Sequence, residues 1–340
     1  MNPTLQDLCG EGRRGAGLAA DRHHVMRRIR GRLSILSALA LLLLCSCAGS
    51  PAGHANDSAR PPLPREVAFN DGVGRRDNLL VAVHLEDGQE LLCSVDTGCP
   101  LTILNESVVG KLGNRIGTEK VNFAFREQQE LPVYRSPKLY LGSTPLLTGS
   151  RVLVGDLRRQ FGARPVAGIL GMDCLRHYCL QLDFRDRKLR FLDPDHLNNA
   201  DLGTAFPLVL APYPMRNIKE GAVAFVDAPL LQEPKVRFWI DTGMHGDADL
   251  LLKSGRFQQT LRRRPPDAIG EYRVAGGTIQ SASLVRFATL DLCGDTYTDV
   301  IVAEVPEEPW SFQGWIGLGF LEKTVVTLNF PRGTMHLKRQ

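Results

Sequence analysis

The chain has 340 residues, 43% of them hydrophobic, so it can bury a sizeable core and does not have the composition of a disordered or fibrous protein. Its formal net charge of +4 comes from the first 46 residues, whose seven Arg outnumber Asp7, Glu11 and Asp21 by four. The remaining chain is neutral and carries no general field for nucleic acid or an anionic membrane, so neither partner is expected from charge.

The N-terminus reads as an export signal. A basic stretch over 26–32 precedes an apolar stretch over 33–44, which is too short for a comfortable membrane span. Nothing before Met26 belongs to such a signal, so we expect translation to start there. The following Leu44-Cys45-Ser46-Cys47 resembles a bacterial lipobox, in which Cys47 would become the lipidated first residue of a membrane-anchored lipoprotein.

Ordinary signal-peptide cleavage between Ala48 and Ala55 is the alternative, and it would release a soluble exported protein. Both interpretations place the mature body outside the cytoplasm, in the cell envelope or periplasm. Residues 1–47 are therefore predicted to be the targeting segment. Residues 48–64, rich in Gly, Ser, Pro, Ala and Asp, are predicted to be a tether.

Short apolar runs at strand-like spacing follow the tether, so the chain is predicted to be mostly β with short helices. The turn Asp87-Gly88 predicts a hairpin between the first two strands, and 193–203 resembles a linker. Short helices are expected over 106–112 and 172–177. Strands are expected over 78–85, 91–95, 121–125, 138–141, 151–154, 179–184, 188–192, 222–226, 236–240, 269–274, 285–292, 299–304, 325–330 and 334–337.

Three sequence blocks occur twice, in the same order and 145 or 146 residues apart. Repetition at a fixed offset indicates a duplicated architecture. The body is therefore predicted to consist of two related lobes, residues 65–192 and 204–340, each of ordinary domain size. The paired blocks are 93–98 with 238–243, 168–175 with 314–321, and 180–184 with 326–330.

In each lobe an apolar strand runs straight into Asp-Thr-Gly, at Asp96 and at Asp241. A carboxylate at the end of a buried strand is costly unless it has hydrogen-bond partners or shares a proton. The Thr hydroxyl can bond across to an opposite loop, and the Gly lets the backbone turn sharply. Two such loops at a two-fold axis would set Asp96 and Asp241 side by side.

Two carboxyl groups about 3 Å apart do not both ionise readily, so such a pair holds one proton and titrates as a unit. One member would act as a base toward a bound water, while the protonated member polarises a scissile carbonyl. This chemistry needs no metal, no other cofactor and no covalent intermediate.

The two motifs, each followed 73 or 74 residues later by a hydrophobic-hydrophobic-Gly block, resemble the retropepsin-like and pepsin-like aspartic proteases over most of residues 65–340. The resemblance implies two tandem β-barrel lobes in a bilobal, pseudo-two-fold arrangement, a monomer with a pseudo-dimeric active site, and a peptide or protein substrate. It implies catalytic carboxylates at Asp96 and Asp241. The residues implied to lock and complete the two loops are Thr97, Gly98, Thr242 and Gly243.

Two departures from the family pattern concern the motifs and the flaps. The residue after Asp-Thr-Gly is usually small in the family, whereas it is Cys99 in the first lobe and Met244 in the second. Family members also close a β-hairpin flap over the substrate. The stretch 272–278, with Gly276 and Gly277 at its tip, is either such a flap or an ordinary hairpin, and 125–130 offers only a polar tip in the first lobe.

Other chemistries find little support in the sequence. His84, His177 and His245 show no metal-ligand spacing, and the cysteines after Cys47 form no C-x-x-C pair, so no metal site is expected. Ser94 lacks the G-x-S-x-G context of a serine hydrolase.

Two further expectations concern the cysteines. Cys93 and Cys293 are expected to be buried core residues. Export permits disulfides, including one between Cys174 and Cys179, but spacing does not fix the pairing.

The sequence thus predicts an aspartic endopeptidase of the cell envelope that uses a water activated by Asp96 and Asp241. The alternative is a catalytically inactive peptide-binding or scaffold protein that keeps the same fold, which Met244 and the weak first flap would suggest. Both Asp-Thr-Gly motifs are intact, and a buried acid pair is costly unless it is used, so catalysis is the favoured prediction.

Overall fold

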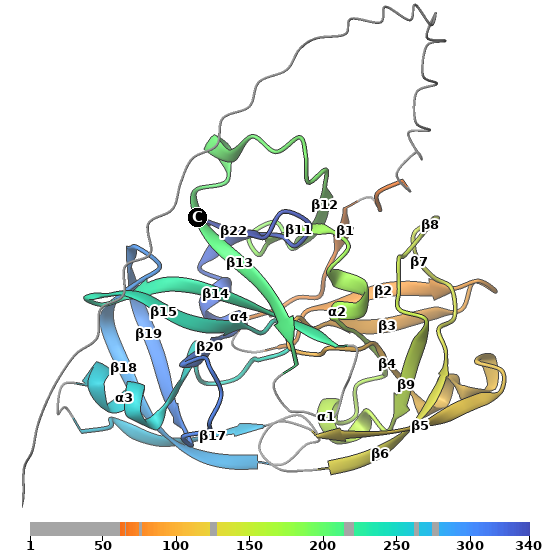
Figure 1. Cartoon of the computed structure of the whole chain (residues 1–340), viewed down its shortest axis with the longest axis horizontal. Coiled ribbons are helices and arrows are strands. Elements are labelled where there is room, and N and C mark those ends of the chain that lie inside the picture. Colours follow the sequence, from red (N-terminus) through yellow and green to blue (C-terminus); the bar gives the residue numbers. More distant parts are fainter. Residues whose placement is uncertain are drawn as a thin grey trace, which may run out of the picture. The chain divides into compact units, whose positions relative to one another are not determined.

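Strands form most of the regular structure, as predicted, and the described helices are short. The computed structural model describes residues 62–64, 66–74, 77–122, 128–213, 221–261, 265–273 and 279–340 (Figure 1). The predicted targeting segment with Cys47, the tether up to residue 61, and Gly276 and Gly277 lie outside these residues. No helix in this described part of the chain is long and apolar enough to cross a membrane.

A nine-stranded sheet contains most of the first half, in the order β5-β6-β9-β4-β10-β3-β2-β7-β8. The predicted hairpin at its centre is confirmed, because β2 and β3 pair antiparallel across a turn in which Gly88 takes a φ of +84°. The strands are β2 (Leu80–Leu85), β3 (Glu90–Val95), β4 (Ile103–Asn105), β5 (Arg115–Asn122), β6 (Gln128–Arg135), β7 (Leu139–Leu141), β8 (Thr144–Pro145), β9 (Arg151–Gly155) and β10 (Val166–Leu170).

A thirteen-stranded sheet contains the rest, in the order β1-β12-β11-β21-β22-β13-β14-β15-β20-β16-β19-β18-β17. The strands are β1 (Val67–Ala68), β11 (Cys179–Asp183), β12 (Lys188–Leu192), β13 (Thr204–Pro212), β14 (Ala222–Leu230), β15 (Glu233–Ile240), β16 (Leu250–Lys253), β17 (Ala268–Arg273), β18 (Ile279–Leu292), β19 (Asp295–Val305), β20 (Gly314–Ile316), β21 (Thr324–Asn329) and β22 (Thr334–Arg339). The α-helices are α1 (Arg158–Phe161), α2 (Met172–Leu175), α3 (Ser254–Leu261) and α4 (Leu318–Leu321), and the 3-10 helices are η1 (Glu106–Lys111) and η2 (Asn199–Asp201).

Each half has the same strand pairings around its Asp-Thr-Gly motif. The strand before the motif pairs in parallel with the strand of the hydrophobic-Gly block, β3 with β10 and β15 with β20. That block strand also pairs antiparallel with the strand after the motif, which is β4 or β16. The strand after the motif pairs in parallel with β9 or β19. The duplicated sequence blocks therefore fold into duplicated structure.

The strands β11 and β21 join the two halves through a symmetric pairing. They run antiparallel with Gln181 opposite Thr327, and these positions are 146 residues apart, the same offset as the sequence repeat. A residue faces its own counterpart only at a two-fold axis. An approximate two-fold axis therefore passes between these two residues, and the Gln181 Nε2 atom donates to the Thr327 Oγ1 atom at 3.2 Å.

Buried hydrophobic side chains form one large cluster and two smaller ones. The large cluster draws on both halves and includes Val95 and Ile240, which directly precede the two motifs. One smaller cluster, around Ile103, belongs to the first half, and the other, around Trp239, belongs to the second. Tyr213 packs against both smaller clusters, so it lies where the two halves meet.

The strand β13 is absent from the predicted set. Pro207 and Pro212 argue against a strand, because proline has no N–H to donate to a ladder. The structure accommodates both prolines at the ends of pairings, since Pro207 is the last residue paired with β22 and Pro212 the last paired with β14. The strand thereby passes from β22 to β14 and makes the large sheet continuous.

Three other predicted boundaries are corrected. The predicted strand 121–125 overlaps only the end of β5, which spans Arg115–Asn122, and 123–125 lie outside the described residues. The first four residues of β5 are exposed, so no hydrophobic alternation marks them. The predicted helix 106–112 is the 3-10 helix η1, and the predicted helix 172–177 is the single turn α2. The segments are too short for an α-helix to gain from propagation.

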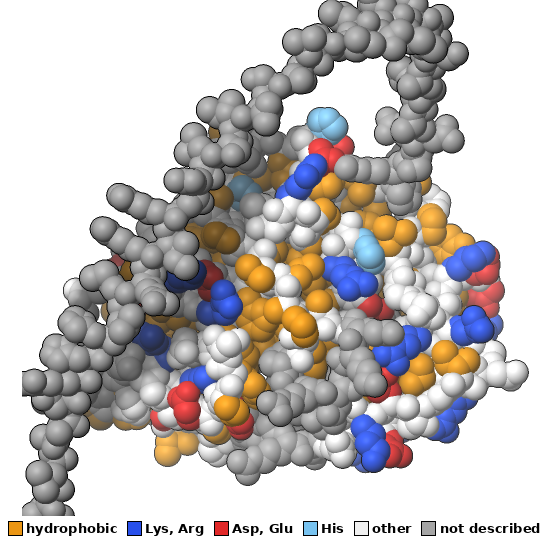
Figure 2. All heavy atoms as spheres, in the orientation of Figure 1, with side chains coloured by type: hydrophobic (Ala, Val, Ile, Leu, Met, Phe, Trp, Pro, Cys, Tyr) orange, Lys and Arg blue, Asp and Glu red, His pale blue; other side chains and the backbone are white. Residues whose placement is uncertain are grey.

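The face of the body in Figure 2 carries hydrophobic side chains over its centre, with Lys and Arg lying beside Asp and Glu toward its sides. Ion pairs in the described part of the chain include Lys111 with Asp87 at 2.5 Å and Lys138 with Glu86 at 2.6 Å. Charges of both signs are thus interspersed on this face, in keeping with the neutral composition of the body.

Candidate active site

The structure brings Asp96 and Asp241 together, although they are 145 residues apart in the sequence. Each follows the last residue of a buried strand, and each backbone N–H donates to the end of the adjacent block strand. The Asp96 N–H donates to the Leu170 carbonyl at 3.1 Å, and the Asp241 N–H donates to the Ile316 carbonyl at 3.0 Å. The parallel pairing of β3 with β10 and of β15 with β20 therefore fixes both aspartates.

Thr97 and Thr242 join the two loops by four reciprocal hydrogen bonds. Each hydroxyl oxygen accepts from the backbone N–H of the other threonine at 3.0 Å. The Thr97 hydroxyl donates to the Ile240 carbonyl at 2.7 Å, and the Thr242 hydroxyl donates to the Val95 carbonyl at 2.8 Å. Both threonines are buried, so these bonds do not compete with water. The structure thus shows the cross-loop bonding that the sequence predicts.

Backbone amides of its own loop hold each carboxylate. The Asp96 Oδ1 atom accepts from the N–H groups of Gly98 at 2.8 Å and Cys99 at 3.1 Å. The Asp241 Oδ1 atom accepts in the same way at 2.9 and 3.0 Å, from the two residues that follow Thr242. One oxygen of each carboxyl group is therefore fixed by the backbone.

The two glycines provide the space in which the carboxyl groups approach. A Cβ atom placed on Gly98 would lie 2.4 Å from the Asp241 Oδ1 atom, and one on Gly243 would lie 2.3 Å from the Asp96 Oδ2 atom. Real Cβ atoms essentially never come so close to another atom. Only glycine at both positions permits the observed arrangement of Asp96 and Asp241.

The electrostatics of the pair follow from this crowding. Burial raises the pKa of Asp96, against the lowering effect of the hydrogen bonds from Gly98 and Cys99. Burial also raises the pKa of Asp241, and there the negative charge of Asp96 adds to the effect. A hydrogen bond between the two carboxyl groups raises the pKa of Asp241 and lowers that of Asp96. The pair therefore favours a state in which the two carboxyl groups share one proton.

Cys99 and Met244 fit the loops despite departing from the family pattern. Both donate a backbone N–H to the preceding aspartate, and their carbonyls accept from Met172 N at 2.8 Å and Leu318 N at 2.9 Å. The Met244 side chain packs against the second smaller cluster. The larger residues therefore change the surroundings of the loops without changing how the loops hold the carboxylates.

The loop after the second motif is longer than the loop after the first. Ile103 pairs with Ile169, while Leu251 pairs with Trp315, so the stretch after the motif is three residues longer in the second half. Inside this longer loop, the fully buried Asp249 accepts from the Ile301 N–H at 2.8 Å. The sequence repeat does not predict this support, because the three additional residues have no counterpart in the first half.

In the first half, Thr102 and Asp173 support the corresponding loop. The Asp173 Oδ1 atom accepts from the Thr102 N–H at 2.7 Å and from the Thr102 hydroxyl at 2.8 Å. Burial raises the pKa of Asp173, and the Thr102 bonds oppose that rise. Asp173 lies in the predicted block 168–175, where its spacing after Gly171 is a signal that sequence reasoning did not use.

Tyr213 lies close to both carboxyl groups and was not predicted as a site residue. Burial raises the pKa of the Tyr213 phenol, and the nearby Cys99, Asp241 and Asp96 groups raise it further. Its ring packs edge-on against Trp239 with a centroid distance of 5.8 Å. The only sequence signal is an aromatic residue between two prolines, because β13 brings it to the site.

Neither a family model nor a curated protein matches this chain.

The remaining predicted residues lie apart from this chemistry or support it indirectly. The His245 Nδ1 atom lies 3.0 Å from the Nδ2 atom of the buried Asn78, which links the second loop to the first half. His177 is exposed, and Ser94 is buried in β3. Among the described residues, no group of three or more His, Cys, Asp or Glu is placed to hold a metal ion.

The five described cysteines are all free, so the possible Cys174–Cys179 disulfide is not formed. Cys93 and Cys293 are 0% and 2% exposed, which confirms that they are core residues. Burial raises the pKa of both thiols to about 12, so they stay protonated and unreactive.

Proposed function

We propose that this chain is an aspartic endopeptidase in which Asp96 and Asp241 activate a water molecule to hydrolyse a peptide bond. The observation that carries the proposal is the reciprocal arrangement of the two Asp-Thr-Gly loops, with four threonine bonds between them and two carboxyl groups in contact across a two-fold axis. A structural role alone gives no reason for two mutually repelling acids at a shared, glycine-lined position.

The proposed mechanism uses the proton that the pair shares. The ionised member would take a proton from a water held between the carboxyl groups. The protonated member would donate a hydrogen bond to the scissile carbonyl oxygen, which carries negative charge in the tetrahedral intermediate. The amides that hold one oxygen of each carboxylate would keep both in position throughout.

In this proposal two hairpins would cover a bound peptide. The hairpin β5–β6 belongs to the first half and β17–β18 to the second, and Figure 1 shows their free ends turned toward each other at one edge of the body. In this proposal both act as flaps. The first flap is then a paired hairpin like the second, and this weakens the reason for considering an inactive scaffold.

The same proposal extends to the fold of the two halves. Each half would be one retropepsin-like lobe, and the chain would resemble a fused two-lobed protease that needs no partner copy. The basic and apolar segment before residue 47 supports an exported protein that is held at the cell envelope through Cys47.

The proposal is tested by digesting a synthetic peptide library with the purified full chain between pH 3.5 and 7.5 and identifying the products by mass spectrometry. Asp96→Asn and Asp241→Asn should fold normally and lose cleavage by at least about 1,000-fold, because neither can share the proton. Asp247→Asn is the matched control, since Asp247 is an exposed aspartate of the same loop.

Cleavage that persists in either dyad variant would contradict the mechanism. A folded wild-type protein that binds peptides but cleaves none of them at any pH would favour the scaffold alternative instead.

A further inference from the structure

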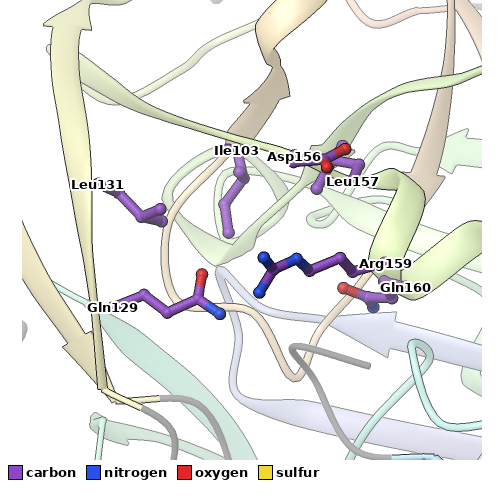
Figure 3. A pocket seen from close by; sticks show the side chains of 8 residues that line it. Ile103, Gln129, Leu131, Asp156, Leu157, Arg159 and Gln160 are labelled. Carbon is purple, nitrogen blue, oxygen red and sulfur yellow. The ribbon is translucent and has the colours of Figure 1, made fainter. Parts of the chain in front are cut away.

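A small pocket of about 30 Å³ lies between strand β6 of the first hairpin and helix α1 (Figure 3). Its apolar side is formed by Ile103, Leu131 and Leu157, which are all buried. Its polar side includes Gln129 from β6 and Gln160 from α1. Such a mixture suits a guest with an apolar stem and a polar head.

The pocket and the proposed active site share one buried hydrophobic cluster. The three apolar residues of the pocket belong to this cluster, against which Cys99 and Tyr213 also pack. Cys99 donates its N–H to Asp96, and Tyr213 lies near both carboxyl groups. The cluster therefore separates the pocket from the carboxyl pair by packed side chains of the same half, which places the pocket beside the proposed site.

The charged residues at the pocket are Asp156, its partner Arg158 and a second arginine, Arg159. The Asp156 carboxylate is held by both ends of the Arg158 guanidinium, at 2.8 Å and 3.2 Å. Arg159 also lines the pocket and is exposed, and its positive charge helps to lower the pKa of Asp156. Figure 3 shows its guanidinium directed across the pocket toward Gln129. Two cations, Arg158 and Arg159, therefore stand beside one carboxylate, and it is Arg158 that forms the hydrogen-bonded pair with it.

We propose that this pocket binds an acidic side chain of the peptide substrate. The inference rests on the proposed peptidase function and adds the substrate class. Arg159 would donate two parallel hydrogen bonds to a carboxylate, a geometry that guanidinium groups favour, and the amide of Gln160 can supply another donor. Glu is favoured over Asp, because its extra methylene group reaches the apolar side of the pocket.

The test compares the cleavage products of the wild-type full chain with those of Arg159→Glu on the same peptide library. In the wild type, Glu should be enriched at one fixed position relative to the cleaved bond. In Arg159→Glu that enrichment should be lost, and Lys or Arg should replace it, with a change of about tenfold in the Glu-to-Lys ratio of kcat/KM. Arg159→Lys should retain part of the preference.

Arg176→Glu is the matched control, because Arg176 is an exposed arginine outside the pocket and its substitution makes the same charge change. It should keep the wild-type product pattern. An unchanged pattern in Arg159→Glu would overturn the inference, and so would an equal change in Arg176→Glu.

A binding measurement separates this inference from the proposed function. Paired synthetic peptides that differ only by Glu or Gln at one position are captured on immobilised Asp96→Asn protein, with and without Arg159→Glu. Retention of the Glu peptides that depends on Arg159 supports the pocket even if the wild type cleaves nothing, in which case the proposed function alone fails. Equal capture of Glu and Gln peptides overturns the pocket even if cleavage is observed.

Discussion

At the scale of single residues, Gly98 and Gly243 decide how closely the two carboxyl groups can approach. Neither glycine takes a positive φ, so the requirement comes from the absence of a side chain and not from the backbone angle. The space that a Cβ atom would fill is already occupied by the carboxyl group of the opposite loop. Glycine therefore serves the pairing of Asp96 with Asp241 directly.

Gly98→Ala is expected to destabilise the protein by about 1 to 3 kcal/mol, because the new methyl group must displace the Asp241 carboxylate or the loop that carries it. Peptide cleavage should fall by at least about 100-fold, since the carboxyl pair would be misplaced. Urea unfolding and kcat/KM measure the two effects. Gly110→Ala is the control, because a Cβ atom there meets nothing within 4 Å.

The raised pKa of Asp241 predicts a dependence of stability on pH. The folded chain binds this proton more tightly than the unfolded chain, whose Asp pKa is about 3.9. The stabilising contribution is therefore fully present below that value and is lost as the pH rises through the folded pKa. Acid should stabilise the protein through this group, in contrast to an ordinary ion-paired aspartate.

Asp241→Asn should remove this dependence, because Asn carries no charge at any pH. Near pH 7 the variant should be more stable than the wild type by about 1 to 2 kcal/mol, and the difference should vanish toward pH 4. Urea denaturation at several pH values measures the effect. A variant that is less stable than the wild type at pH 7 would contradict the assignment of burial and like charge as the cause.

At the scale of elements, the hydrogen bonds of the two threonines join two separate loops into one unit. Each loop follows its own strand, and the strands belong to different sheets. The hydroxyl groups of Thr97 and Thr242 each donate to the strand that precedes the other motif. The carboxyl groups thus keep a fixed distance because the ends of β3 and β15 are joined.

Thr242→Val keeps the shape of the side chain but removes its hydroxyl group. The substitution leaves the Thr97 N–H and the Val95 carbonyl without their hydrogen-bond partners. We therefore expect the free energy of unfolding to fall by about 2 to 4 kcal/mol. Thr242→Ser should keep most of the wild-type stability, because serine retains the hydroxyl group. The prediction fails if valine is tolerated as well as serine. A double-mutant cycle that combines Thr242→Val with Thr97→Val should show strong energetic coupling between the two sites.

At the scale of the whole molecule, the largest hydrophobic cluster draws on both halves. Residues 60–340 also form one compact unit, which contains both predicted lobes. The joint formed by β11 and β21 and the shared cluster both oppose independent unfolding of the halves. We therefore expect the body to unfold in a single cooperative transition.

The three tryptophans test this expectation, because Trp239, Trp310 and Trp315 all lie in the second half. Their fluorescence reports on that half, whereas far-UV circular dichroism reports on both. The two urea midpoints should coincide. Leu180→Ala would leave a cavity in the first half, and it should lower the fluorescence midpoint as well as the circular dichroism midpoint. Separate midpoints would show that the halves unfold independently.

Features that depend on local pattern could be predicted from the sequence. The strands around Asp96 and Asp241, the hairpin at Gly88 and the repeat offset all follow from residues close together in the chain, where apolar spacing and turn chemistry act. The bonding of the two threonine hydroxyls could also be predicted, because a duplicated motif places equivalent groups face to face.

Features that depend on distant segments could be seen only in the folded chain. The strand β13 forms because β22 and β14 both offer edges to it, which outweighs the two prolines, and it carries Tyr213 to the carboxyl pair. The pocket with Arg159 exists because β6 and α1 lie against each other. No local pattern specifies such contacts, because their free energy depends on packing between elements far apart in the chain.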